Sequence, residues 1–397
     1  MKNWFWIATA IALTIPALYL RLNGSPLAVW AEAIVFGVAI VSAAFLLSWA
    51  AEVAELEISQ ALVLALLAIV AVLPEYAIDM YFAWTAASQP EYASYAAANM
   101  TGANRLLVGI GWPLVVLLSW FKLKAKAVEL DKPQTTEIAF LVIATLYSFT
   151  IPMKGHLSLV DTVVFLTIFG FYIWSSSKSE QVEPELTGPS VNLAALPRKK
   201  RIATISGLFL FSGTIILASA EPFAQGLLGT AENLGIDEFI MVQWIAPLAS
   251  EAPELIIATI FVLNANAAAA LGMLVSAKVN QWTLLVGMLP LVYSIAAGAP
   301  SALPLDIRQV EEILLTASQS ALALVFLSRL HLSMSAAGLL FFLFASQLVL
   351  TSTAARYGYS ALYLAIMLGM LLKDRGRATS MFHLVWDTFK GMKRNVN

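Results

Sequence analysis

The sequence predicts an all-α protein that crosses a lipid bilayer many times. Of its 397 residues, 60% are apolar and 12% are charged, and the mean hydropathy is +0.80. Soluble domains carry about 25% charged residues, roughly twice this share. Apolar stretches of about 20 residues, long enough to span a bilayer, recur along the whole chain. Because lipid cannot satisfy free backbone N–H and C=O groups, these stretches must be helices.

Twelve membrane spans are predicted, and the first is kept as a helix because no signal-peptide cleavage site follows it. The spans are 4–20, 26–51, 58–87, 91–121, 135–152, 157–177, 202–228, 237–263, 266–297, 309–328, 333–352 and 357–372. A long polar connection containing several prolines divides the chain near its middle. The predicted organisation is an extra N-terminal helix at 1–25, a first repeat at 26–177, a cytoplasmic linker at 178–201, a second repeat at 202–352, and an extra helix with a basic tail at 353–397.

The distribution of Lys and Arg predicts that both termini are cytoplasmic. With the N-terminus inside, the outer segments hold only Arg21, Lys154, Arg308 and Arg356, and the inner segments hold most of the other basic residues. Basic residues concentrate on the inner side of membrane proteins. The tail after Arg377 has the pattern of a basic amphipathic helix lying on the inner leaflet. We therefore expect an integral protein of the plasma or inner membrane, whose first partner is the lipid bilayer.

Two pairs of spans resemble each other across the central linker. Leu73-Pro74-Glu75 has its counterpart in Ala252-Pro253-Glu254, at a spacing of 179 residues. Leu-Leu-Val-Gly occurs at 106–109 and again at 284–287, at a spacing of 178. Five spans separate equivalent helices, and this odd number forces opposite orientations. The sequence thus predicts two inverted repeats, the architecture in which transporters build a site near the bilayer midplane.

Each repeat places a carboxylate directly after a proline in the middle of a span. Proline lacks an N–H and clashes with the preceding turn, so Pro74 and Pro253 are expected to break their helices and free backbone carbonyls. An unpaired carboxylate at this depth costs at least ~2.5–3.5 kcal/mol, which makes a functional role the default for Glu75 and Glu254. Carbonyl and carboxylate oxygens together suit a hard cation such as Ca²⁺ or Na⁺.

These segments resemble the sodium/calcium exchanger superfamily, whose two inverted repeats carry G-T-S-L-P-E-like and G-N-x-x-G-S-N-like motifs. The matching segments here are 70–75 and 98–104 in the first repeat, and 249–254 and 272–278 in the second. The resemblance implies five helices per repeat, which leaves one extra helix at each end of the chain. It also implies that Glu75 and Glu254 are the central cation ligands and that Asn104 supplies an amide oxygen.

The chain departs from the family motifs at four positions. Ala71 and Val72 stand where the family has a small polar pair, and in the second repeat Ser250 is kept but Glu251 follows it. Lys278 stands where the family places an Asn or Asp ligand. A protonated lysine cannot coordinate a cation. The departures therefore argue against the full multi-ion site of a sodium/calcium exchanger.

Glu251 and Lys278 are interpreted together, and two interpretations stay open. They either form a static ion pair between two helices, or Lys278 acts as a built-in cation that releases its proton when the substrate ion arrives. Burial favours loss of a lysine's proton.

Several other polar residues in the spans have two interpretations each. Asn104 and Ser250 are ligands or helix–helix hydrogen-bonding groups. Asp79, one turn beyond Glu75, lines the entry path or is a solvated rim residue. Arg105 is expected to snorkel or to pair with a carboxylate.

The resulting hypothesis is a secondary antiporter that moves Ca²⁺ or Na⁺ across the membrane in exchange for H⁺. Ordinary Na⁺/Ca²⁺ exchange is the nearest alternative, and a passive cation channel is the alternative from another class. An intramembrane enzyme is disfavoured because mid-span Ser250 has no histidine partner. The chain has no cysteine, and it has no recognisable nucleotide motif or basic face for nucleic acid. We therefore expect no cofactor, no nucleotide and no nucleic acid, with small inorganic cations as substrates.

Overall fold

The computed structural model describes residues 2–24, 27–57, 72–132, 134–178, 186, 188–350 and 352–394. Within these residues, ten helices are long and apolar enough to cross a membrane, which confirms the all-α membrane fold class. The predicted span 333–352 corresponds to a shorter apolar helix, Met334–Val349. Much of the span predicted at 58–87, with Val70 and Ala71, lies outside the described residues. The total of twelve spans therefore stays a prediction.

The chain divides into two compact units, and each unit combines segments from both halves of the chain. The first consists of Met1–Phe82 and Ser177–Pro253, and the second of Ala83–Ser176 and Glu254–Asn397. Two helices, α4 (Leu73–Thr85) and α12 (Glu238–Leu263), contribute to both units. In α12 the division falls between Pro253 and Glu254.

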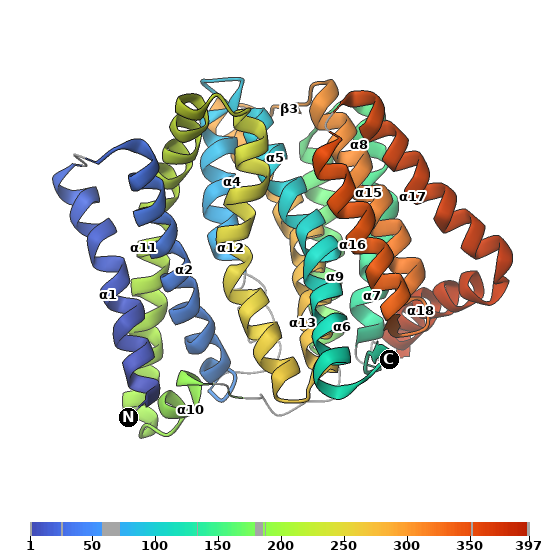
Figure 1. The fold of residues 1–397 in the computed structure, drawn as a ribbon, viewed down its shortest axis with the longest axis horizontal. Helices are drawn as coiled ribbons and strands as arrows, with labels where there is room; N and C mark the ends of the chain where they lie inside the picture. The colour runs from blue at the N-terminus through green and yellow to red at the C-terminus, as the bar shows by residue number, and fades with distance from the viewer. Residues whose placement is uncertain are drawn as a thin grey trace. The chain divides into compact units, whose positions relative to one another are not determined.

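The first unit is built around three long helices that run side by side (Figure 1). These are α1 (Lys2–Asn23), α2 (Val29–Ala54) and α11 (Arg198–Leu234), joined by the short α10 (Pro189–Ala194). α2 and α11 approach closely because glycine stands at their contact. A Cβ added at Gly226 would lie 2.9 Å from the backbone of Ala33, and one at Gly229 would lie 2.8 Å from Val29. Small residues at such a contact are how membrane helices maximise their packing.

The predicted linker is more helical than the sequence suggests. Residues 189–194 form α10, and α11 begins at Arg198, so this helix is longer at both ends than the predicted span 202–228. Asn3 Nδ2 donates to the carbonyl of Gly188 at 2.8 Å, which ties the start of α1 to α10. Glu57 accepts from Arg198 at 3.0 Å and from Arg201, which ties the end of α2 to the start of α11. These polar contacts hold one end of the first unit together.

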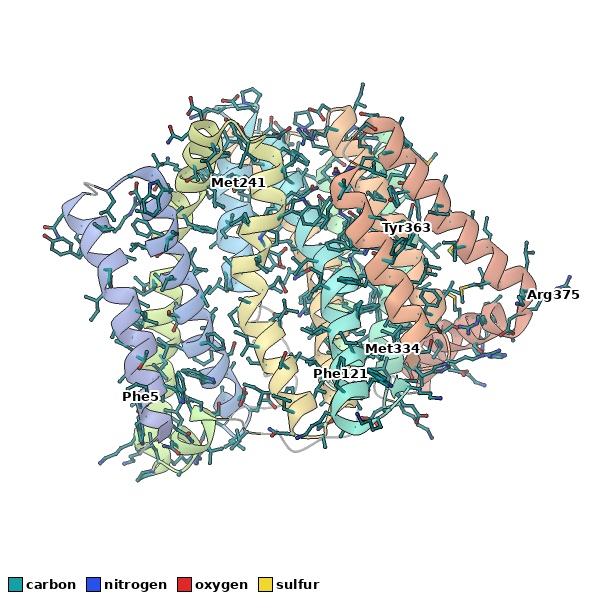
Figure 2. The ribbon with its side chains drawn as sticks, in the orientation of Figure 1. Phe5, Phe121, Met241, Met334, Tyr363 and Arg375 are labelled. Carbon is teal, nitrogen blue, oxygen red and sulfur yellow. The ribbon has the colours of Figure 1, made fainter. Side chains whose placement is uncertain are left out.

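The second unit contains the remaining helices. They are α5 (Tyr92–Leu106), η1 (Leu107–Gly111), α6 (Trp112–Leu123), α7 (Gln134–Ser148), α8 (Thr150–Lys154), α9 (Leu159–Ser176), α13 (Ala267–Asn280), η2 (Gln281–Leu285), α14 (Val286–Ala297), α15 (Ile307–Leu327), α16 (Met334–Val349), α17 (Thr353–Lys373) and α18 (Arg375–Arg394). The basic tail forms α18, and Figure 2 shows Arg375 where the chain turns from α17 into it. Phe382 and Trp386 of α18 are exposed and stack at 5.9 Å. Its placement on the inner leaflet stays a prediction.

Two short antiparallel ladders tie the loops of the second unit together. β1 (Ala127–Glu129) pairs with β4 (His331–Ser333), and β2 (His156–Leu157) pairs with β3 (Leu303–Pro304). α15 begins just after β3 and ends just before β4, so the two ladders lie at opposite ends of this helix. Its first turn is closed by a capping box between Asp306 and Gln309, an arrangement that satisfies free N–H groups at a helix start.

Of the two helix breaks that the prolines predict, the one at Pro253 can be checked, whereas Pro74 lies in the first turn of α4, next to residues outside the described part of the chain. α12 continues as one helix through Pro247 and Pro253, so the break expected at Pro253 is wrong. Among the described residues, the next helix of each pair is instead interrupted by a π-helical segment, η1 in one pair and η2 in the other. π-Helical turns occur often at functional sites. η1 and η2 are 174 residues apart, so the Leu-Leu-Val-Gly segments, 178 apart, differ in structural register by about one helical turn.

Candidate cation site

Two carboxylates of the first unit lie on one face of α4. Glu75 is 1% exposed and Asp79 is fully buried. Because side chains four residues apart lie one above the other on a helix, the two carboxylates face the same way. Glu75 lies in the first turn of α4, just after Pro74, where the positive end of the helix dipole favours a negative charge. Asp79 is therefore a buried neighbour of Glu75, and its interpretation as a solvated rim residue is wrong.

Three polar side chains of α12 are buried close to its two prolines. Ser250, Glu251 and Glu254 are 4%, 2% and 7% exposed. The hydroxyl of Ser250 donates to the carbonyls of Ala246 and Pro247, each at 3.3 Å, and its lone pairs remain able to accept or coordinate. Prolines within a helix remove the N–H partners of earlier carbonyls. α12 thus combines carboxylate, hydroxyl and carbonyl oxygens, the ligand types that hard cations prefer.

The second unit brings Asn104 and Lys278 into direct contact. Both side chains are fully buried. Lys278 Nζ donates to Oδ1 of Asn104 at 2.8 Å and to its backbone carbonyl at 3.1 Å. The same nitrogen lies 4.6 Å from the ring centre of Trp282, close enough for a cation–π interaction. The amide nitrogen of Asn104 donates to the carbonyl of Met100 at 2.8 Å, which fixes the orientation of the amide.

The amide oxygen that the family resemblance assigns to the substrate cation therefore holds an internal cation in this structure. The ammonium of Lys278 takes two oxygens of one residue, as a small monovalent cation would. The contact therefore joins Asn104, which the family resemblance predicts to be a cation ligand, to Lys278, which stands where the family has an Asn or Asp ligand. The pairing of Lys278 with Glu251 stays a prediction.

Arg105, the residue after Asn104, belongs to a buried group of charged side chains. Its guanidinium lies 2.5 Å from Glu312 of α15, and Arg356 of α17 contacts the other oxygen of the same carboxylate at 3.1 Å. The expected pairing of Arg105 with a carboxylate is confirmed. The sequence analysis places Arg356 in a segment between two spans, which is wrong because it lies in the first turns of α17 and is 2% exposed. The side of the membrane on which it lies stays a prediction.

Sequence reasoning missed Glu312, the buried position of Arg356 and the ring of Trp282. One signal was available for Arg356. Arg356, Ser360 and Tyr363 are spaced by four and three residues, which is the periodicity of one helix face, in an otherwise apolar span.

A further acidic group lies at the end of α2, outside the predicted span. Burial and the nearby charge of Glu52 raise the pKa of Glu55 to about 7. Hydrogen bonds from Arg201 and Arg198 lower the pKa of Glu57. Glu55 can therefore gain or lose a proton near neutral pH, whereas Glu57 stays ionised and structural.

A family model described as sodium/calcium exchanger protein matches residues 27–178 and 204–353, which is more than half of the chain. The chain belongs to this family. Membership confirms the resemblance that the Pro-Glu segments indicate, and with it the class of cation antiporter. The matched ranges end where α17 begins, so α1, α17 and α18 lie outside the match apart from Thr353.

Solved structures of exchangers are similar to this one. The crystal structure of the H⁺/Ca²⁺ exchanger CAX is 46% identical, with a TM-score of 0.93, covering 98% of this chain and 99% of that chain. Native YfkE is 15% identical with a TM-score of 0.62, covering 93% and 99%. The sodium-calcium exchanger NCX_Mj is 16% identical with a TM-score of 0.55, covering 81% and 98%. The last two likenesses show the fold alone. No curated protein sequence matches the chain at a significant level.

Proposed function

We propose that this family member exchanges Ca²⁺ for H⁺, with Glu75 and Glu254 as the principal ligands of both ions. The observation that carries the proposal is the burial of both carboxylates, each directly after a proline in a helix of the membrane domain. Similarity along the whole chain to a protein described as an H⁺/Ca²⁺ exchanger supports the choice of ions.

Charge balance gives the physical reason for this exchange. Two ionised carboxylates carry a charge of −2, which is costly within a bilayer. One Ca²⁺ or two protons neutralise that charge equally well, so the site can be moved through the membrane in either loaded form. The empty, doubly charged site is the costly form, which couples release of one ion to binding of the other. Ser250 and the carbonyls of α12 would supply further oxygens for Ca²⁺, and Asp79 would lie on its entry path.

Lys278 bears on the choice between H⁺ and Na⁺ as the counter-ion. Several Na⁺ ions need several neutral oxygen ligands, and the oxygens of Asn104 are already used by Lys278. Protons need only the carboxylates. Ordinary Na⁺/Ca²⁺ exchange is therefore the second candidate.

We further propose that both termini lie in the cytoplasm, because this orientation puts most Lys and Arg residues on the inner side of the membrane.

The test is ion flux in proteoliposomes with internal Ca²⁺ and pH recorded together. An outward H⁺ gradient should drive Ca²⁺ uptake, and imposed Ca²⁺ gradients should move H⁺ the other way. Glu75→Gln and Glu254→Gln should each abolish both fluxes and leave a folded protein, because an amide is less costly to bury than a carboxylate. Glu221→Gln is the control, since Glu221 is also a glutamate next to a proline within a helix, here on the N-terminal side of Pro222, but is 41% exposed and paired with Arg21.

The flux measurement also separates the alternatives. Ca²⁺ uptake that requires a Na⁺ gradient and moves no protons would establish Na⁺/Ca²⁺ exchange instead. Ca²⁺ current without any counter-ion would establish a channel. Wild-type exchange by either Gln variant would remove that carboxylate from the site.

A further inference from the structure

The last long helix of the second unit, α17, buries polar side chains rather than apolar ones. The structure describes all of α17, and three of its residues are buried: Arg356, Ser360 and Tyr363. Tyr363, labelled in Figure 2, is fully buried, whereas Leu362, Leu368 and Leu372 are exposed. Figure 1 shows α17 beside α15 and α16. Its apolar sides therefore suit lipid, and its one polar stripe faces the protein.

The polar stripe of α17 meets a carboxylate that is already shared. Oε1 of Glu312 lies 3.1 Å from Nε of Arg356, and Oε2 lies 2.5 Å from Nη2 of Arg105. The side chains of Arg105, Glu312 and Arg356 are 0%, 1% and 2% exposed. Removing one partner from such a buried group leaves an uncompensated charge, which is strongly destabilising. α17 is thus linked to α5 through a single carboxylate of α15.

The turn of α5 held by this group is the one that presents Asn104. Arg105 is fixed twice, because its backbone carbonyl also accepts from Gln319 of α15 at 3.4 Å. On the N-terminal side of Arg105, the side-chain and backbone oxygens of Asn104 accept from the ammonium of Lys278. On its C-terminal side, α5 gives way to η1 at Leu107. An interrupted helix needs external support at this point, and Glu312 supplies it.

We infer that Arg356 is a positioning residue for the cation site: through Glu312 and Arg105 it fixes the turn of α5 that keeps Asn104 on Lys278. When that turn loosens, the ammonium of Lys278 is no longer held by Asn104, and a mobile positive charge repels the substrate cation. α17 then sets the affinity for Ca²⁺ from outside the part of the chain that matches the family model. This inference rests on the proposed Ca²⁺ transport for its effect on affinity, but its structural part does not.

The experiment compares Arg356→Met with Arg329→Met. Arg329 pairs with Asp374 at 2.7 Å near the other end of α17, and both side chains are partly exposed, so its loss also removes a contact of this region. Arg356→Met should raise the Ca²⁺ concentration for half-maximal transport by about fivefold or more, a typical coupling between sites. The maximal rate per folded protein should change little. Arg329→Met should leave both values unchanged.

Hydrogen exchange provides a readout that does not depend on transport. Amides of residues 104–111 should exchange faster in Arg356→Met, whereas those of α9 should not change. Arg356→Lys keeps the charge but loses the planar guanidinium, so it should show smaller changes in both measurements. It also serves as the test if the Met variant does not fold.

The outcomes separate the inference from the proposed function. If Arg356→Met, or Arg356→Lys in its place, matches Arg329→Met in both affinity and exchange, the inference is overturned and α17 is a packing helix. If the wild type transports no Ca²⁺ but the exchange of 104–111 still rises, the positioning role stands and the proposed function fails. If Ca²⁺ transport is coupled to H⁺ and exchange does not rise, the inference alone fails.

Discussion

The two helices that carry Asn104 and Lys278 are interrupted in the same way but hold opposite chemistry. α5 gives way to η1 three residues after Asn104, and α13 gives way to η2 three residues after Lys278. One helix offers an amide oxygen at this position, and the other offers an ammonium that binds to it. The repeat has kept its backbone geometry while the two copies have taken complementary roles. An inverted repeat therefore need not contribute two equal halves to a cation site.

The segments that follow these two helices, η1 in the first repeat and α14 in the second, also differ in how tightly they pack. Gly109 of η1 packs against Phe344 of α16, the last helix of the second repeat. Gly287 of α14 packs against Phe165 of α9, the last helix of the first repeat. Each glycine thus contacts the opposite repeat, but Gly109 is the more crowded of the two. The first copy is therefore expected to tolerate change less well.

The largest effect should follow from separating the amide and the ammonium. Asn104→Leu removes the amide oxygen that accepts from the buried ammonium of Lys278 and should cost about 1.5–3 kcal/mol, the worth of a hydrogen bond to a charged group. Lys278→Met should cost less, because a neutral amide is cheaper to leave without a partner than a charge. Thermal unfolding in detergent measures both changes.

The double variant tests whether the two residues act as a pair. Asn104→Leu with Lys278→Met should be more stable than the sum of the single changes predicts, because neither partner is left behind. Thr101→Val is the matched control, since its hydroxyl bonds within α5 to Ala97 at 2.7 Å. Additive losses for Asn104 and Lys278 would mean that their contact contributes nothing to stability.

A smaller effect should follow from filling the glycine contacts. An added Cβ at Gly109 would lie 2.5 Å from Cβ of Phe344, and one at Gly287 would lie 2.9 Å from Cβ of Phe165. Overpacking of this kind costs typically about 1–3 kcal/mol, so Gly109→Ala should lower the unfolding temperature more than Gly287→Ala. Gly170→Ala on α9 meets nothing within 4 Å and should be neutral or stabilising. Equal losses at Gly109 and Gly287 would contradict the difference in packing.

The fold class and the buried carboxylates could be predicted because their signals are local. Span length and charge scarcity follow from the thickness of the bilayer, and Pro-Glu at equivalent positions marks Glu75 and Glu254 without any knowledge of packing. Helix ends were less predictable. α11 extends through residues that read as a polar linker, because Arg201 can lie at its start and bond to Glu57.

The contacts between helices could not be predicted because they depend on crossing geometry. Lys278 and Asn104 are 174 residues apart, and nothing in either helix indicates which residue of the other it meets. The repeat itself misled at this point. Leu-Leu-Val-Gly occurs in both copies, yet the π-helical segments show that equivalent residues lie one turn away from that match. The shared Leu-Leu-Val-Gly sequence therefore indicates a similar apolar surface in both repeats rather than structurally equivalent residues.

The smallest expected effect is on the pH dependence of Ca²⁺ affinity. Its measurement decides whether Lys278 releases a proton during transport. Binding of Ca²⁺ to protonated carboxylates releases H⁺, so apparent affinity for Ca²⁺ should rise with pH. Glu55 complicates the measurement because its pKa of about 7 makes it lose a proton in the same range. Its negative charge then attracts cations at higher pH, so Glu55 also makes the apparent affinity for Ca²⁺ rise with pH. Glu55→Gln is therefore the background for the experiment.

In that background, Lys278→Met should leave the slope of Ca²⁺ affinity against pH unchanged. Lys278 Nζ contacts two oxygens and the ring of Trp282, and these contacts favour an ammonium over a neutral amine. The coupled protons then come from Glu75 and Glu254, and the variant shifts affinity by a similar factor at every pH. Lys126→Met, at an exposed lysine, controls for the loss of one positive charge. If the slope flattens in Lys278→Met alone, the lysine itself releases a proton, and the second copy of the repeat supplies part of the coupling.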